Sequence, residues 1–218
     1  YARWAPTYSV IVVTNENRSG TGSLTQAIAD AEAGDEIRFD GGYSITVAPI
    51  SQSNPGGLDG FVLDKDVVIN GVGHHVELVG RPDHRIVTIQ GGSNVTLKDL
   101  DLRGGDQSSQ GRNNGGAIMV STDAHLNVRD VRFLDNQADA NGGAIWLQSD
   151  SEATIEDSRF DANEAGSQGG AIFVGTNSSL TVRNTSFTAN ALNTALSGQW
   201  IGGGAIAFGN SGTGRIES

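Results

Sequence analysis

Charged side chains are densest between residues 99 and 106, where Asp99, Asp101, Arg103 and Asp106 follow one another closely. Hydrolysis of a glycosidic bond uses two carboxyl groups, one of them an acid with a raised pKa. A polysaccharide lyase uses a base and a charge neutraliser, often Ca²⁺ with Arg or Lys. A strand would place Asp99 and Asp101 on one face because its side chains alternate. The cluster is therefore the candidate site of a polysaccharide-active lyase or hydrolase.

The histidines suggest a second kind of chemistry. His74 and His75, together with His84, could form a metal site, whereas His125 stands apart in the sequence. Adjacent residues on a strand point to opposite faces, so we expect solvated or locally bonded imidazoles and no metal site. The chain has no cysteine, which excludes disulfides and thiolate ligands. We expect no cofactor, except for Ca²⁺ if the chain is a lyase.

Composition limits the partners. The 218 residues carry a formal net charge of -11, so nucleic acid and anionic membranes are poor partners. No stretch approaches the roughly 20 apolar residues of a membrane-spanning helix. Glycine accounts for 31 residues and proline for only 4, a balance typical of many short strands joined by tight turns.

A repeat organises the chain from residue 115 onward. The tetrapeptide Gly-Gly-Ala-Ile begins at Gly115, Gly142 and Gly169, in steps of 27 residues, and again at Gly203 after 34 residues, which implies a 7-residue insertion. A Phe-x-x-Asn motif keeps the 27-residue step, at Phe133 and Asn136, Phe160 and Asn163, and Phe187 and Asn190. A fixed step makes each repeat one turn of a coil in which like residues stack about 4.8 Å apart. The pattern predicts an all-β fold, a right-handed parallel β-helix.

Alternation within each repeat gives the motif residues structural roles. The inward columns are Ile118, Ile145, Ile172 and Ile206, and Phe133, Phe160 and Phe187. The Asn column is expected to take left-handed corners and to bond along the stack. Glycine pairs suit corners that need positive φ or close approach. The same alignment places Asp99 with Asp130 and Asp157, which favours a solvated outer corner over catalysis at Asp99.

One helix is predicted, over residues 23–31. Ser23 and Gln26 form a capping box, apolar residues recur at helical spacing, and Gly34 is a plausible stop. A short helix of this kind would cover the open end of a β-helix. We expect residues 1–50 to hold the N-terminal strands and this cap, and residues 51–218 to form the turns of one continuous domain within a longer protein. No second cap is recognisable after Gly203, so we expect a further segment or another chain to cover the last turn.

The entry segment and the repeats together resemble a family. The segment from Gly20-Thr21-Gly22-Ser23-Leu24 through Gly34-Asp35-Glu36-Ile37-Arg38-Phe39 is similar to the CSLREAI-type entry of bacterial right-handed β-helix surface proteins, although it lacks their Cys. The GGAI and FxxN repeats resemble those of chlamydial polymorphic outer-membrane proteins and adhesin-like passengers. The resemblance implies an exported bacterial protein at the cell surface or outside the cell, with a role in autotransport, anchoring or adhesion.

One column does not fit a purely structural account. Met119, Trp146 and Phe173 follow the Ile of successive GGAI copies and should point outward as a contiguous apolar patch. Either the inserted loop with Trp200 and Ile201 covers the patch, or a protein partner or second copy does, or it stacks on sugar rings. We therefore expect a non-enzymatic structural or adhesive module, with self-assembly into a filament or matrix as one mode of action and the polysaccharide-active enzyme as the alternative.

Overall fold

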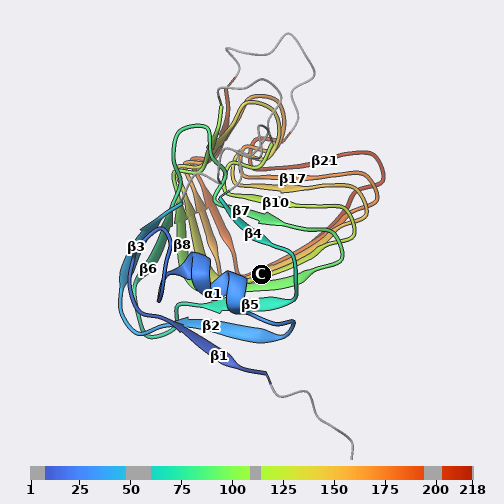
Figure 1. Ribbon diagram of the computed structural model, residues 1–218. Helices are drawn as coiled ribbons and strands as arrows, with labels where there is room; N and C mark the ends of the chain where they lie inside the picture. Colours follow the sequence, from blue (N-terminus) through green and yellow to red (C-terminus); the bar gives the residue numbers. More distant parts are fainter. Residues whose placement is uncertain (1–7, 48–59, 109–113, 194–202, 218) are drawn as a thin grey trace, which may run out of the picture.

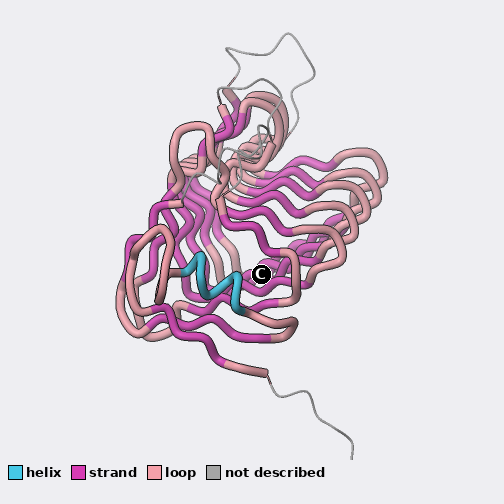
Figure 2. Tube along the Cα trace, in the orientation of Figure 1, coloured by secondary structure: helices cyan, strands magenta, loops and turns pink. Residues whose placement is uncertain are grey.

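The chain winds into a stack of parallel β-strands, in a computed structural model that describes residues 8–47, 60–108, 114–193 and 203–217 (Figures 1 and 2). Three parallel sheets run along the stack. The largest has 12 strands: β1 (Val10–Val13), β2 (Asp35–Phe39), β3 (Tyr43–Thr46), β5 (Val67–Asn70), β6 (Val76–Val79), β8 (Asn94–Arg103), β11 (His125–Leu134), β14 (Glu152–Glu156), β15 (Arg159–Asp161), β18 (Ser179–Arg183), β19 (Ser186–Thr188) and β22 (Thr213–Glu217).

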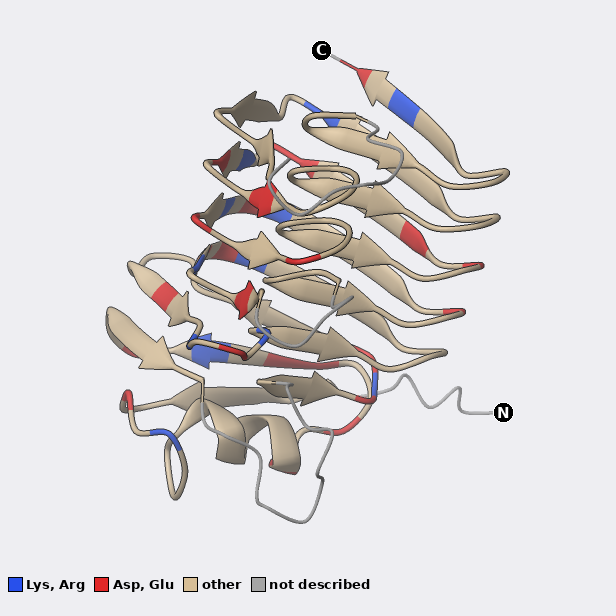
Figure 3. Cartoon of the chain, turned by 90° about the horizontal axis from the view of Figure 1, so that it is seen from above, with Lys and Arg blue, Asp and Glu red and all other residues tan. Residues whose placement is uncertain are grey.

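The other two sheets close each turn. One has six strands: β4 (Phe61–Leu63), β7 (Val87–Ile89), β10 (Ile118–Val120), β13 (Ile145–Leu147), β17 (Ile172–Val174) and β21 (Ile206–Phe208). The other has four: β9 (Asp106–Gln107), β12 (Gln137–Ala138), β16 (Glu164–Ala165) and β20 (Ala191–Leu192). Each strand pairs with the equivalent strand of the next turn, so the predicted parallel β-helix is confirmed, with about six turns (Figure 3). Among the described residues, no helix is long and apolar enough to cross a membrane.

Identical side chains lie above one another inside the coil. Ile118 lies opposite Ile145, which lies opposite Ile172, and Ile172 lies opposite Ile206. The rings of Phe133 and Phe160 are stacked 4.4 Å apart, and those of Phe160 and Phe187 are 4.9 Å apart. These columns belong to one continuous core, which is why a 27-residue step in sequence becomes a single step along the stack.

The two glycines of each GGAI motif serve different needs. The first has a positive φ, +63° at Gly142, a conformation that costs a residue with a Cβ. In the first three copies the second glycine has no room for a side chain; a Cβ on Gly143, for example, would lie 2.2 Å from the carbonyl oxygen of Gly170 in the next turn. The motif therefore reflects a positive φ at the first glycine and a close approach between turns at the second.

The Asn column forms a buried ladder of side-chain amides. Asn136 Nδ2 donates to Asn163 Oδ1 at 2.9 Å, and Asn163 Nδ2 donates to Asn190 Oδ1 at 2.8 Å. The expectation that these asparagines take left-handed backbone conformations is wrong. The residue before each of them does so instead, namely Asp135, Ala162 and Ala189, with φ between +52° and +54°. The amide is thereby turned into the interior, where it bonds along the stack.

The helix α1 (Leu24–Asp30) lies at the N-terminal end of the stack, beside β1, β2 and β5 (Figure 1). The Ser23 hydroxyl accepts a hydrogen bond from the backbone N–H of Gln26 at 3.2 Å and so caps the first turn. Leu24 and Ala27 belong to the buried core. At the C-terminal end of the helix, the ammonium of Lys65 donates to the carbonyl of Ala31 at 3.1 Å, which satisfies a helix-terminal acceptor. The boundary predicted between residues 50 and 51 lies outside the described residues.

Candidate functional site

A pocket of about 230 Å³ opens on the outer surface at one corner of the coil. We call it the corner pocket, and six of its eight lining residues are polar or charged. It is lined by His74, His75, Val76, Asp99, Leu100, Asp101, Asp130 and Arg132. These residues come from three successive turns, so the pocket exists only in the coiled state.

A break in the repeat forms one wall of this pocket. Asn70 of β5 lies opposite Lys98, and Glu77 of β6 lies opposite Asp101. Between these two pairs, the turn of β8 has only Asp99 and Leu100, whereas the turn before it has residues 71–76. The longer connection, residues 71–75, is called the lip. It places His74 and His75 over the floor formed by the next two turns.

The position of these two histidines differs from the sequence-based expectation. His74 and His75 precede β6 in a bend and are not strand residues. The prediction that they point to opposite faces of a strand is therefore wrong, and both line the corner pocket. Within the described ranges, no three His, Asp or Glu side chains are grouped as metal ligands would be.

Asp101 is the buried anion of the pocket, with only 7% of its surface exposed. Both of its carboxylate oxygens contact Arg132, whose Nε lies 2.6 Å from Oδ1 and whose Nη2 contacts Oδ2. The hydrogen bond to Asp101 raises the pKa of Arg132 further above its usual value. His75 Nε2 lies 3.8 Å from Asp101 Oδ2. Both oxygens of this carboxylate are engaged by one guanidinium, which favours a structural role over contact with a reacting group.

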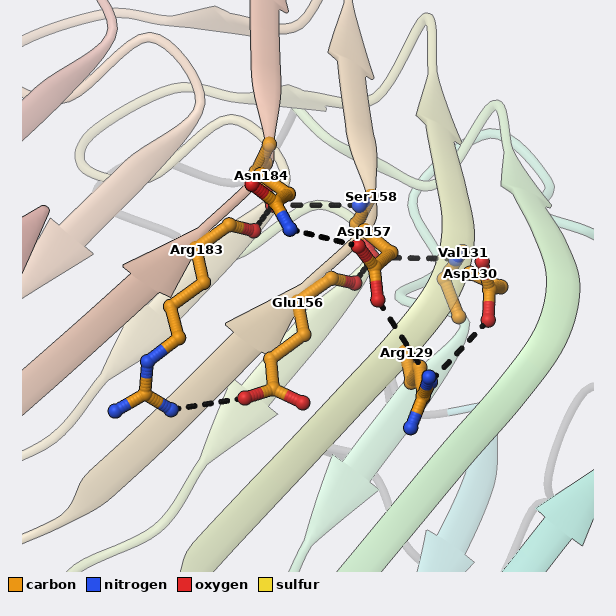
Figure 4. Close-up of polar contacts among 9 residues, drawn as sticks. Arg129, Asp130, Val131, Glu156, Asp157, Ser158, Arg183 and Asn184 are labelled. Carbon is orange, nitrogen blue, oxygen red and sulfur yellow. Dashed lines mark hydrogen bonds and ion pairs between the residues drawn. The ribbon is translucent and has the colours of Figure 1, made fainter. Parts of the chain in front are cut away.

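Asp99 and Asp130 belong to a column of left-handed corner residues that continues through Asp157 to Asn184, with φ between +46° and +53°. Figure 4 shows how its later members are held. Arg129 Nε lies 3.4 Å from Asp130 Oδ2 and 3.7 Å from Asp157 Oδ2, and Asn184 Nδ2 donates to Asp157 Oδ1 at 3.2 Å. Asp99 differs, because no side-chain hydrogen bond or ion pair to its carboxylate is found among the described residues.

The structure divides the charged cluster predicted from the sequence. Asp99 and Asp101 line the corner pocket, but Arg103 and Asp106 do not. Arg103 instead lies 3.5 Å from Asp135 Oδ2 and 3.9 Å from Glu77 Oε1. Asp106 of β9 accepts a hydrogen bond from the backbone N–H of Ser108 at 2.8 Å. Four further residues of the lining were not predicted from the sequence as part of this site: His74, His75, Asp130 and Arg132.

The second candidate surface is the outer column on β10, β13 and β17. Met119 lies opposite Trp146, and Trp146 lies opposite Phe173. All three side chains are half-buried, between fully buried neighbours on either side. The Nε2 atom of Gln148 lies 3.6 Å from the sulfur of Met119. Trp200 and Ile201, expected to cover this column, lie outside the described residues.

The described residues form a parallel β-solenoid that carries a pocket at a corner. Residues 69–217 match the family described as right handed beta helix region, and the chain belongs to that family. A comparison with curated proteins finds no match. The fold is compatible with surface or adhesive modules and also with lyases and hydrolases, so function has to be argued from the sites.

Proposed function

We propose that this protein is a non-enzymatic structural or adhesive module, exported by a bacterium to the cell surface or the extracellular space. The repeated GGAI and FxxN residues support the proposal because their roles lie in turns, ladders and core. The proposal extends to self-association into a filament or matrix, or to binding of other surface proteins. It follows the resemblance to adhesin-like β-helix proteins.

The observation that carries the proposal is the apolar stripe, defined as Met119, Trp146 and Phe173. Neighbouring strands of a parallel sheet are about 4.8 Å apart, so three large side chains in register form one continuous strip. The strip is only half-buried within the chain. Exposed aromatic and Met side chains are enriched at protein interfaces, where they supply most of the binding energy.

The test is the double substitution Trp146→Ser and Phe173→Ser. Loss of two aromatic anchors should weaken self-association or partner binding at least tenfold, while circular dichroism and thermal melting still report the coil. Analytical ultracentrifugation measures the self-association. The matched control is Val10→Ser with Val12→Ser, which removes two exposed apolar side chains from β1 at the other end of the stack. Equal behaviour of the two double variants, or unchanged assembly, would count against the stripe.

A second candidate function is a polysaccharide-active lyase or hydrolase, favoured by the presence of Asp99 and Asp101 in one pocket. Against it stands the ion pair that holds Asp101 on Arg132. An active enzyme should release product from an acidic glycan, with or without Ca²⁺, and lose that activity in Asp99→Asn and Asp101→Asn. Wild-type protein that gives no product across a glycan panel would eliminate this candidate.

A further inference from the structure

We propose that the corner pocket binds a single sugar unit through adjacent hydroxyl groups. The inference rests on the proposed function in one respect, namely that the pocket binds its ligand without turning it over. It concerns a different surface from the apolar stripe. It arises from the pocket's pattern of charges, its rigid lip and its size.

The charge pattern does not favour a metal or ammonium ligand. The carboxylate of Asp101 is paired with Arg132, and that of Asp130 lies 3.4 Å from Arg129. Asp99 is thus the one carboxylate of the lining for which the described residues supply no such partner. A single open carboxylate gives a cation little to hold it, because hard cations need several oxygen ligands.

Donors and acceptors stand side by side in the pocket instead. Arg132 has five N–H groups, and its Nε and Nη2 atoms contact the carboxylate of Asp101. Half of its side-chain surface remains exposed. The exposed imidazoles of His74 and His75 can each donate and accept. Asp99 accepts. A sugar hydroxyl both donates and accepts, so a pair of neighbouring hydroxyls can match a carboxylate and a cationic donor together, and hydrogen bonds to charged groups are the stronger ones.

The lip is fixed before any ligand arrives. The side-chain oxygen of Asn70 accepts the backbone N–H of Val72 at 3.0 Å, and the N–H of His74 donates to the carbonyl of Gly71 at 3.0 Å. Gly71 packs directly on the corner below, because a Cβ there would lie 2.2 Å from the carbonyl oxygen of Asp99. The backbone carbonyl of His75 also accepts the N–H of Tyr43 from the preceding turn. A preformed site loses less entropy on binding.

The size of the corner pocket further restricts the class of ligand. At about 230 Å³ the pocket is smaller than the roughly 300–1,000 Å³ typical of sites for drug-sized molecules. One ring, bound from the outer surface, suits it better than a buried oligosaccharide. A single shallow contact of this kind should give a dissociation constant on the order of 1 mM. Several copies on an assembled surface would raise the overall avidity.

The experiment is an NMR titration that observes the imidazole signals of the four histidines. His74 and His75 line the pocket, whereas His84 and His125 do not and serve as internal controls. The probes are the methyl glycosides of glucose, galactose and mannose, up to about 50 mM, well above the expected dissociation constant. At least one of them should shift the signals of His74 and His75 in a saturable way, with those of His84 and His125 unchanged.

A matched pair of variants tests the role of Asp99. Asp99→Asn should weaken binding at least tenfold, because a charge-assisted acceptor becomes a neutral amide. Asp157→Asn changes the same corner outside the pocket and should leave binding unaltered. Both should fold, since Asn184 already occupies this corner with a φ of +46°.

Three results would overturn the inference: no shift with any of the three glycosides, equal shifts at all four histidines, or equal losses in the two variants. Shifts produced by ethylammonium but not by the glycosides would also overturn it, in favour of a cation site. Glycan turnover that depends on the pocket would refute the non-enzymatic function while leaving the sugar contact intact. A failed titration alone would leave the apolar stripe untouched.

Discussion

The buried amide ladder gives the sharpest test of what holds the coil together. Replacing Asn163 by Ala removes four side-chain hydrogen bonds: two accepted from Asn136 and two donated, to the Phe133 carbonyl and to Asn190 Oδ1. At a net contribution of about 0.5–1.5 kcal/mol each, their loss should lower the free energy of unfolding by about 2–6 kcal/mol. The upper part of that range is expected because the site is fully buried and water cannot replace the amide.

The matched variant is Asn190→Ala, at the end of the same ladder. Its side chain makes three hydrogen bonds, but the position is only half-buried, so water can take over part of them. We expect a loss of about 1 kcal/mol. Urea unfolding followed by circular dichroism measures both variants. Equal losses, or a loss below about 1 kcal/mol for Asn163→Ala, would refute the view that the ladder stabilises the coil.

Three further predictions concern other parts of the scaffold. Gly143→Ala should lower the free energy of unfolding by about 1–3 kcal/mol, because its Cβ would collide with the next turn. Gly204→Ala should leave it nearly unchanged, because a Cβ there meets no described atom within 4 Å. Urea unfolding compares the two variants. Phe160→Leu should lower the free energy of unfolding by about 1–3 kcal/mol, because two ring-stacking contacts are lost. In the same urea experiments the loss should be smaller than that of Phe160→Ala. Two backbone N–H groups donate hydrogen bonds to the carboxylate of Asp35 and lower its pKa. The contribution of Asp35 to stability is therefore present above about pH 3.9 and is lost as the pH falls through its folded-state pKa. Asp35→Asn should therefore lower the melting temperature at pH 7 and much less at pH 3; equal shifts at both values would contradict this.

The periodic part of the molecule was predictable because its physics repeats. A 27-residue step can keep Ile above Ile and Phe above Phe only if each repeat is one turn, and the pairing of Ile118 with Ile145 follows directly. The helix was predictable for a local reason, since the Ser23 hydroxyl bonds the N–H three residues later. The first inference applies one rule at every repeat, and the second applies a rule that spans only three residues.

The failures occurred where two neighbouring residues can exchange roles. Asn is the usual candidate for a left-handed corner, yet Ala162 adopts that conformation and Asn163 does not. A left-handed conformation costs an alanine roughly 1–2 kcal/mol. The four side-chain hydrogen bonds of Asn163 offset this cost, because only an amide facing the interior can reach the turns above and below it. Local propensity cannot reveal a conformation that is stabilised by the neighbouring turns.

The corner pocket was missed for a related reason, and that reason indicates where function lies in such a fold. Residues 71–75 break the register, and a sequence gives the length of an inserted connection but not the side on which it folds. The floor of the pocket is ordinary, because the left-handed corner of Asp99 and Asp130 recurs at Asp157, which does not line the pocket. What distinguishes Asp99 is the lip above it, so a periodic corner acquires a specific environment from one aperiodic turn. Regular turns supply rigidity and spacing, and specificity in this chain should accordingly map to residues beside the breaks in the repeat.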